Sequence, residues 1–368
     1  MGGDGVMAKL GEICLINPKS CTLRDDTEVS FIPMTKVGEH GEFDASEIKN
    51  YSEVKKGFTN FQNGDVLFAK ITPCMENGKG AIAHNMKNGI GFGSTEFHVL
   101  RPDTDKITRE WLYYLTTWKT FRKEAERNMT GSAGQKRVPK TFLENYVVNL
   151  PDIDTQKSEN KILRKVDDLI SLCKQQLAKL DELVKARFVE MFGDPIRNDK
   201  HFVQKTGKSL FCFSSGKFLQ EEKRFQHGFP VYGGNGITWY TDIPLVKKPT
   251  IIIGRVGAYC GNVRMVNVPV WITDNAIYIK EFKTRELNLH FLLMLMKYMK
   301  FSNYADYSGQ PKITQKPLET LIYIVPPLEL QNRFAAFVER VDQQKQTVQQ
   351  SLEKLELMKK ALMQEYFG

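Results

Sequence analysis

Two long stretches of the chain repeat apolar residues at spacings of mostly four and three, which is the heptad pattern of paired helices. The first begins near Gln156, and its apolar positions are Val166, Ile170, Cys173, Leu177, Leu180, Val184 and Met191. The second lies at the end of the sequence, with Val341, Val348, Leu352, Leu355, Leu362 and Tyr366. About 37 residues at about 1.5 Å each predict a rod of roughly 55 Å. Because Lys345 and Lys359 interrupt the second seam, we expect a short and imperfect coiled-coil pairing. We expect the two helices to run antiparallel.

Prolines and a glycine mark the ends of these helices. Pro151 and Pro326 precede them, where a fixed φ favours a helix start, and Gly193 follows the first helix. Ahead of each long helix the pattern predicts short strands and loops, an amphipathic helix, a Gly-Gln loop and a further strand. The amphipathic helices are expected at about 107–123 and 287–301, and the strands at 146–150 and 321–325. The predicted fold class is therefore α/β.

The two halves of the sequence follow one plan. A shift of 175 residues places GQKRVPKTFLENYVVNLPDIDTQ on GQPKITQKPLETLIYIVPPLELQ, and the match continues without a gap to the last residue. At least sixteen of the sixty positions from Gly134 to Gly193 are identical to their partners. Upstream, Thr95-Glu96 resembles Thr273-Asp274, and two apolar strand candidates (66–69 and 251–253) each lead to a base, Lys70 or Arg255. The order is module, helix, module, helix.

Length and charge sharpen this division. With 368 residues and 42.2 kDa, the chain exceeds what one hydrophobic core usually holds. We place the first module at 1–155, the first spacer helix at 156–193, the second module at 194–325 and the second spacer helix at 326–368. Residues 201–325 hold 16 basic and 8 acidic side chains, whereas residues 1–150 hold 20 and 19. Eight of the nine net positive charges therefore come from the second module, where they suit the binding of phosphates.

Several familiar patterns are missing from the sequence. No run of about eighteen apolar residues is present, and the start lacks the pattern of a signal peptide, so we expect a soluble, cytoplasmic protein. The cysteines form no CxxC pair and the histidines no HxxxH spacing, so we expect neither a disulfide framework nor a metal site. The Pro-Pro tetrapeptide of adenine methyltransferases is also missing, because Val325 and Leu328 flank Pro326-Pro327. We therefore expect no cofactor and no catalytic residue in this chain.

Seven segments, taken together and in this order, resemble the specificity (S) subunit of type I restriction-modification systems over essentially the whole chain. They are GDVLFAKITPCMENGKGAIA (64–83), GSAGQKRVPKTFLENYVVNLP (131–151), FGDP (192–195), VYGGNGI (231–237), TIIIGRVGAYCGNV (250–263), YSGQPKITQKPLETLIYIVPPLELQ (307–331) and the closing helix. Each segment alone is a weak pattern. Their duplication and their order make the resemblance specific.

The resemblance implies two target recognition domains, each of which reads one half of a split site in double-stranded DNA. The long helices would set the gap between the halves and dock the methyltransferase (M) subunits, two copies of them, with restriction (R) subunits as further partners. Those partners would carry the chemistry, N6-methylation of adenine and DNA cleavage, and would bind S-adenosylmethionine, ATP and Mg²⁺. The balanced charge of the first module departs from this picture, because DNA-binding surfaces usually carry an excess of basic side chains.

The repeat separates two kinds of DNA-binding candidate. Positions shared by both copies serve what the copies have in common, so Gln135 and Gln310 support the loop or a phosphate more readily than they read adenine. The basic residues that follow these glutamines are candidates for phosphate contacts: Lys136, Arg137 and Lys312. Base readout must lie where the copies differ, in polar residues of Gly-rich loops: Lys70, Thr72 and Lys79 in the first module, and Tyr232, Asn235, Arg255 and Tyr259 in the second. A surface or turn role is the alternative for each.

A partner-binding surface is expected on the long helices, because a pair of helices buries only one stripe of each. Apolar residues outside the heptad seam need cover, and we select Leu169, Leu183, Phe188 and Phe334. Partner subunits would provide that cover. Contact with the chain's own modules is the alternative for any one of them.

Three functions remain open at this point. The main hypothesis is a DNA-binding specificity subunit without catalysis. A self-contained methyltransferase or nuclease should show a cofactor or metal constellation, which the sequence lacks. A coiled-coil scaffold with two protein-binding modules predicts no salt-dependent affinity for duplex DNA.

Overall fold

The structure is a computed structural model that describes residues 5–132 and 134–368. The chain forms two compact units, and each long helix contributes one end to each unit. Unit 1 contains the chain up to Leu172 together with Leu352–Gly368, and unit 2 contains Cys173–Ser351. The long helices are α6 (Ile153–Phe192) and α10 (Leu328–Phe367), both uninterrupted over 40 residues.

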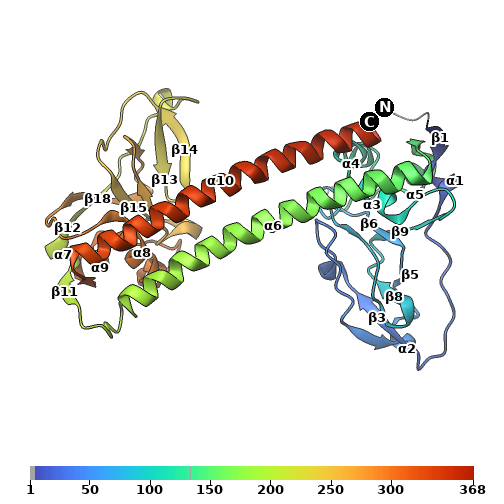
Figure 1. Cartoon of the computed structure of the whole chain (residues 1–368), viewed down its shortest axis with the longest axis horizontal. Coiled ribbons are helices and arrows are strands. Elements are labelled where there is room, and N and C mark those ends of the chain that lie inside the picture. Colours follow the sequence, from blue (N-terminus) through green and yellow to red (C-terminus); the bar gives the residue numbers. More distant parts are fainter. Residues whose placement is uncertain (1–4, 133) are drawn as a thin grey trace. The chain divides into compact units, whose positions relative to one another are not determined.

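The described strands of unit 1 form two four-stranded sheets and a two-stranded ribbon (Figure 1). The first sheet has the order β2 (Cys14–Ile16), β9 (Phe97–Pro102), β6 (Val66–Ala69), β7 (Gly80–Ile82). The second has the order β4 (Ile48–Asn50), β3 (Glu28–Ile32), β8 (Ile90–Gly93), β5 (Thr59–Gln62). The ribbon pairs β1 (Val6–Lys9) with β10 (Val147–Leu150). The helices are α1 (Leu10–Ile13), α2 (Tyr51–Val54), α3 (Arg109–Thr117), α4 (Lys119–Arg127) and α5 (Lys140–Asn145), with 3-10 turns η1 (Met34–Lys36) and η2 (Lys87–Gly89).

Unit 2 follows the same plan in its own described strands. Its main sheet has the order β12 (Phe211–Ser215), β18 (Ala276–Phe282), β15 (Thr250–Gly254), β16 (Val263–Val266). A three-stranded sheet has the order β14 (Gly236–Thr241), β13 (Phe229–Gly233), β17 (Trp271–Ile272), and a ribbon pairs β11 (Val203–Thr206) with β19 (Ile322–Val325). The helices are α7 (Gly207–Leu210), α8 (Leu289–Tyr298) and α9 (Gln315–Thr320), with 3-10 turns η3 (Glu221–Lys223), η4 (Gly257–Tyr259) and η5 (Phe301–Tyr304).

The two units are therefore structural repeats, as the sequence predicts. The main sheets have corresponding strand orders, and the second sheets each contain one parallel pair, β3 with β8 and β13 with β17. A shared glutamine fixes the start of each long helix. Buried Gln156 donates to the carbonyls of Lys106 and Pro151 at 2.9 and 2.8 Å. Its partner Gln331 donates to the carbonyls of Glu286 and Pro326, both at 2.8 Å. The identity of these residues reflects one structural role used twice.

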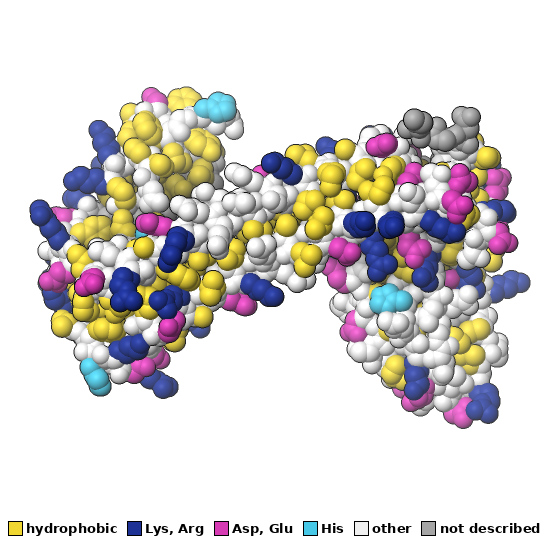
Figure 2. All heavy atoms as spheres, viewed as in Figure 1, with side chains coloured by type: hydrophobic (Ala, Val, Ile, Leu, Met, Phe, Trp, Pro, Cys, Tyr) yellow, Lys and Arg dark blue, Asp and Glu magenta, His cyan; other side chains and the backbone are white. Residues whose placement is uncertain are grey.

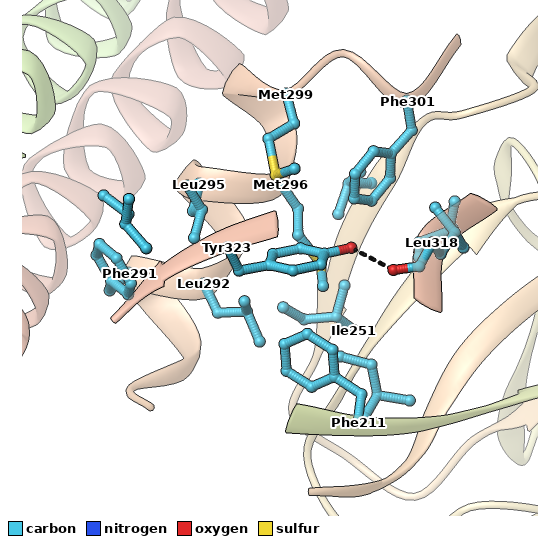
Figure 3. Packing of buried hydrophobic residues seen from close by; sticks show 14 of the residues in the cluster. Phe211, Ile251, Phe291, Leu292, Leu295, Met296, Met299, Phe301, Leu318 and Tyr323 are labelled. Carbon is cyan, nitrogen blue, oxygen red and sulfur yellow. Dashed lines mark hydrogen bonds between the residues drawn. The ribbon is translucent and has the colours of Figure 1, made fainter. Parts of the chain in front are cut away.

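Each unit closes its core with the ends of the long helices. In unit 2, Phe211, Phe291, Leu318 and Tyr323 surround the centre of the cluster, and the Tyr323 hydroxyl donates to the Leu318 carbonyl at 3.0 Å (Figure 3). Some apolar residues of α6 and α10 are buried members of these cores. They are Leu163 and Met363 in unit 1, and Leu180, Val184, Phe188, Phe192, Phe334, Val338 and Val341 in unit 2. Burial of this apolar area is the main stabilising contribution in both units.

Within each unit the segments of α6 and α10 run antiparallel. In unit 1, the Trp111 ring contacts Phe367 of α10 at 4.8 Å and donates to Glu159 of α6 at 2.9 Å, while Asp167 pairs with Lys359 at 2.6 Å. Residue numbers in α6 therefore increase along the contact while those in α10 decrease, as expected for antiparallel helices. In unit 2, Asp181 pairs with Lys345 at 2.6 Å and Phe188 packs on Phe334 with ring centroids 5.5 Å apart. The two lysines that interrupt the heptad seam therefore each pair with an aspartate of the facing helix.

One predicted helix is wrong. The stretch 107–123 forms two helices, α3 and α4, because the backbone of Trp118 is extended (φ −62°, ψ 130°) and ends the first of them. The Trp118 indole packs on Phe367, with ring centroids 6.3 Å apart. Burial of a large aromatic side chain therefore fixes a break that the apolar spacing does not reveal. In unit 2 the corresponding prediction, 287–301, is shortened to α8.

Candidate nucleic-acid interface

The same junction of strand and loop occurs once in each unit. In unit 1 the Lys70 amide donates to the Glu96 carbonyl, and the Lys70 carbonyl accepts from Val138, both at 2.9 Å. In unit 2 the Arg255 amide donates to the Asn275 carbonyl, and the Arg255 carbonyl accepts from Ile313, again both at 2.9 Å. The residues that follow Lys70 and Arg255 bridge to Arg137 and Lys312, respectively. We call these two places the junctions; each joins the end of a buried strand to the Gly-Gln loop.

This pairing corrects one part of the repeat alignment. In the structure Glu96 of unit 1 is equivalent to Asn275 of unit 2, because their carbonyls accept the equivalent hydrogen bonds. The sequence comparison had placed Glu96 on Asp274, one residue too early. The pairing of Lys70 with Arg255 agrees with the sequence comparison, since both follow the central strands β6 and β15.

The junction of unit 1 holds its basic side chain in an ion pair. Nε and Nη2 of Arg137 each donate to one oxygen of the Glu96 carboxylate at 2.8 Å, and Nη1 donates to the Gln135 carbonyl at 3.1 Å. The Arg137 guanidinium lowers the pKa of Glu96 below its usual value, and Lys70 and His98 add to this effect. Arg137, predicted as a phosphate contact, is therefore already engaged, whereas Gln135 and Lys136 are exposed.

The other candidates of unit 1 are also partly committed. Thr72 donates to Oε1 of Glu76 at 2.7 Å, and Nζ of Lys79 donates to the Met34 carbonyl at 3.2 Å. Lys70 is half-buried beside the Glu96 carboxylate. The structure therefore brings Lys70, Thr72 and the Gly-Gln loop together. The Lys79 carbonyl accepts from the Ala69 amide beside Lys70, but its ammonium group is held by the Met34 carbonyl.

A buried arginine supports the loop that follows β6. Arg122 of α4 is 8% exposed and donates to the carbonyls of Met75 at 2.5 Å and Gly78 at 3.0 Å. Its guanidinium also lies over the Phe68 ring, 5.2 Å from the centroid. Burial lowers the pKa of Arg122 to about 10. Thr72 and Lys136 line a hollow of about 670 Å³ beside this loop, together with Glu76, Lys123, Glu126, Arg127, Met129 and Gly134.

The junction of unit 2 has a different charge arrangement. No ion pair within 4.0 Å involves Lys312 or Arg255 in the part of the chain that the structure describes. Nη1 of Arg255 donates to the Asp274 carbonyl at 3.2 Å, and Lys312 and Gln310 are exposed. Tyr259, in the turn η4 beside this junction, is 48% exposed. These side chains lie within one small region and are available to a ligand.

Tyr232 and Asn235 lie on the neighbouring β13–β14 hairpin. Gly234 of this hairpin sits against the junction, because a Cβ added there would lie 3.6 Å from Cα of Gly254. The Asn235 carbonyl accepts from Nη2 of Arg264 at 2.8 Å, and Tyr232 is half-buried. Apolar side chains gather over β13 and β14 (Figure 2). The exposed apolar residues here are Phe225, Ile237 and Trp239, and the Arg224 guanidinium lies 4.4 Å from the Trp239 ring centroid.

Two of the predicted partner contacts are wrong. Phe188 and Phe334 are 1% and 0% exposed and pack on each other in the core of unit 2, so the chain itself covers them. Leu169 and Leu183 are each 47% exposed. They belong to a larger set of exposed apolar residues on the two long helices: Ile162, Leu169, Leu172, Leu183, Val189, Leu328, Leu357 and Met358. Figure 2 shows part of this set over α6 and α10 of unit 1.

The two long helices share a surface stripe that the sequence-based predictions do not include. On α6, Lys179, Leu183, Ala186 and Glu190 are all exposed at spacings of four, three and four, which places them on one helix face. The matching positions of α10 are Lys354, Met358, Ala361 and Glu365, also exposed. Three of the four pairs are identical. The available signal was identity between the copies at positions outside the heptad seam, where core packing does not require it.

A duplicated α/β unit, each copy followed by a long helix, defines a class of modular protein with an internal repeat. A family model described as "Type I restriction modification DNA specificity domain" matches residues 4–182 and 202–357. The chain therefore belongs to the type I restriction modification DNA specificity domain family.

Curated relatives agree with this membership. The chain is 46% identical over 179 residues to the type I restriction enzyme EcoAI specificity subunit of Escherichia coli, which is 47% of this chain and 30% of that protein. It is 41% identical over 179 residues to the EcoEI specificity subunit of the same species, at 47% and 29% coverage. The chain thus matches less than a third of the length of these two relatives. A putative type I restriction enzyme specificity subunit from Methanocaldococcus jannaschii, MjaX, is 26% identical over 372 residues, covering 91% of this chain and 83% of that one.

Two solved structures share the fold. The type I restriction-modification S subunit from M. genitalium has a TM-score of 0.64 at 18% identity and covers 99% of this chain and 96% of its own. A structure from work on complex assembly and conformational transition of the type I R-M system has a TM-score of 0.59 at 18% identity, covering 99% and 98%. Among the described residues, no helix is both long and apolar enough to span a membrane.

Proposed function

We propose that this chain is the specificity subunit of a type I restriction-modification complex, which binds double-stranded DNA and reads a bipartite, asymmetric site without catalysing a reaction itself. The observation that carries this proposal is the junction that occurs once in each unit on the same backbone frame with different side chains. Lys70 and Arg137 occupy it in unit 1, and Arg255 and Lys312 in unit 2. Family membership supports the same conclusion.

Two dissimilar readers in one chain explain an asymmetric target. A symmetric dimer reads two equal half-sites about one helical turn apart because its two reading elements are identical. Here the backbone frame is repeated, but the side chains that reach a groove differ. Each unit then reads its own half-site, and the basic side chains of Lys312 and Lys136 contribute sequence-independent contacts to phosphates.

The partners we propose are methyltransferase subunits, in two copies, and restriction subunits. The stripe shared by α6 and α10 supports two copies of one partner, because the same exposed residues are presented twice. A surface with apolar positions between a lysine and a glutamate suits a protein partner with the complementary charges. We further propose that S-adenosylmethionine, ATP and Mg²⁺ bind to these partner subunits and not to this chain.

The direct test is methyl transfer with and without partners. The full chain incubated with duplex DNA and S-adenosylmethionine should bind DNA in a salt-dependent way but transfer no methyl group. Addition of the methyltransferase subunit should produce N6-methyladenine at one specific sequence. Methylation by the isolated chain would favour a self-contained enzyme, and the lack of any salt-dependent DNA binding would favour a protein scaffold.

A further inference from the structure

The two junctions differ at one pair of equivalent positions, and this difference decides whether the basic side chain is held in an ion pair. Glu96 of unit 1 and Asn275 of unit 2 occupy equivalent positions of the repeat, and so do Arg137 and Lys312. In unit 1 both oxygens of the Glu96 carboxylate accept from Arg137 at 2.8 Å. Asn275 carries no charge and cannot form the same ion pair with Lys312. Arg137 of unit 1 is therefore paired with a carboxylate, whereas the equivalent Lys312 of unit 2 is not.

We propose that Glu96 masks Arg137 from DNA phosphates, so that the junction of unit 2 carries the stronger sequence-independent attraction for DNA. This inference rests on the proposed DNA-binding function. The carboxylate occupies the side-on pair of donors, Nε and Nη2, and Nη1 donates to the Gln135 carbonyl, so each nitrogen of the guanidinium already has an acceptor and the side-on fork is closed to a phosphate. A phosphate would have to displace Glu96 and would meet its negative charge at close range.

The charges around the pair agree with masking. Glu96 is flanked by Lys70 and His98 as well as Arg137, and the side chain of the pair remains partly exposed, 40% for Arg137 and 25% for Glu96. The pair therefore lies at the surface where a ligand can approach. In unit 2, Lys312 contributes to lowering the pKa of Asp306, after hydrogen bonds from Ser308, but forms no ion pair with it. The exposed Lys312 ammonium keeps its charge available.

The test compares salt dependence in charge-swapped variants of the full chain. Binding to a mixed-sequence duplex of about 30 base pairs is measured by fluorescence anisotropy between about 50 and 200 mM salt. Glu96→Gln should steepen the dependence of log K on log salt by about 0.9, which is one additional phosphate contact and a roughly 3.5-fold larger loss of affinity across that range. Asn275→Glu should do the reverse and remove about one contact.

Two controls separate masking from a general charge effect. Asp103→Asn makes the same charge change at the opposite end of β9, about 20 Å along the strand from Glu96. This variant should leave the slope unchanged. Adding Arg137→Ala to Glu96→Gln should return the slope to that of the wild type, because the unmasked group is then removed. Circular dichroism of each variant checks that the fold is retained.

Each outcome decides between the two claims. If the wild type shows no salt-dependent binding, the proposed DNA-binding function fails before the variants are compared. If the wild type binds and Glu96→Gln leaves the slope unchanged, masking is wrong although the proposed function stands. Weaker binding by Glu96→Gln would also overturn masking, because it would mean that Glu96 orients Arg137 toward DNA.

Discussion

The two units solve one structural problem in different ways. Each must hold the loop that follows its central strand, β6 or β15, in place. Unit 1 uses a polar brace, the two hydrogen bonds from Arg122 to the carbonyls of Met75 and Gly78. Unit 2 uses close backbone packing, because Gly261 lies against Phe301 and Ser302 without space for a side chain. A repeated frame can therefore be kept while the chemistry that supports it changes.

The same contrast extends to the surface. In unit 1 the junction arginine, Arg137, is held in an ion pair with Glu96, whereas in unit 2 Lys312 forms no ion pair among the described residues and the junction lies beside the exposed ring of Tyr259. The charge counts of the two sequence segments show the same difference. Shared residues such as Gln156 and Gln331 hold the frame, and the units differ in the loops of their junctions, where we propose that base-specific contacts are made.

The largest expected effect comes from the close packing in unit 2. Gly261 has a φ of +82°, and a Cβ there would lie 2.2 Å from the Ser302 amide nitrogen. Gly261→Ala should reduce the free energy of unfolding by about 3–5 kcal/mol, measured by denaturant unfolding. The equivalent Gly78→Ala meets only the Glu39 carbonyl at 3.3 Å and should cost about 1–2 kcal/mol for its positive φ. Gly309→Ala, with nothing within 4 Å, serves as the control. Equal losses at Gly261 and Gly78 would contradict the contrast.

The polar brace of unit 1 should give the next largest effect. Arg122→Leu leaves the buried carbonyl of Met75 and the partly buried carbonyl of Gly78 without their donor and should destabilise unit 1 by about 2–4 kcal/mol. Arg127→Leu, on the same helix but exposed, is the matched control and should change stability by less than about 0.5 kcal/mol. The two variants are compared by denaturant unfolding. Similar losses for both would show that Arg122 does not brace the loop.

A smaller effect is expected for DNA binding at the junctions. Arg255→Ala should cost about 1–3 kcal/mol of binding free energy and relax one position of one half-site, if its guanidinium contacts a guanine. Lys70→Ala, at the equivalent place in unit 1, should affect the other half-site only. Binding to a panel of single-base variants of the target measures both effects. A uniform loss across all sequences would reassign Arg255 to a phosphate.

The smallest effect concerns pH. Arg137 holds the pKa of Glu96 below its ordinary value of about 4.3, so this ion pair stabilises the folded state above that pH. The contribution is lost as the pH falls through the lowered pKa of Glu96. The wild type should exceed Glu96→Gln in stability by less than about 1 kcal/mol at pH 7, because the pair is partly exposed. The difference should shrink in acid. A difference that stays constant down to pH 3 would contradict the assignment.

The sequence predicts the frame of this molecule better than its surface. The duplication, both long helices and the strands that precede them follow from apolar spacing and self-similarity, since these features depend on local sequence. The break at Trp118 does not, because it depends on contact with Phe367, far away in the chain. The burial of Phe188 and Phe334 is missed for the same reason.

The candidate site shows a similar division. The sequence correctly identifies Lys70 and Arg255 as equivalent positions of the repeat, from the apolar strands that precede them. The pairing of Arg137 with Glu96 lies outside what spacing predicts, because the two residues are brought together only when β9 and the Gly-Gln loop meet. The shared stripe on α6 and α10 was visible as identical residues, but its exposure is known only from the fold.

The central claim is that each unit reads its own half of one DNA site. The measurement that tests it most directly is methylation mapping of host DNA after the loops and sheets of one unit are replaced by those of a relative with another specificity. The account predicts a site in which one half is new and the other half is unchanged, with the reciprocal result when the other unit is replaced. A change in both halves after a single replacement would contradict it.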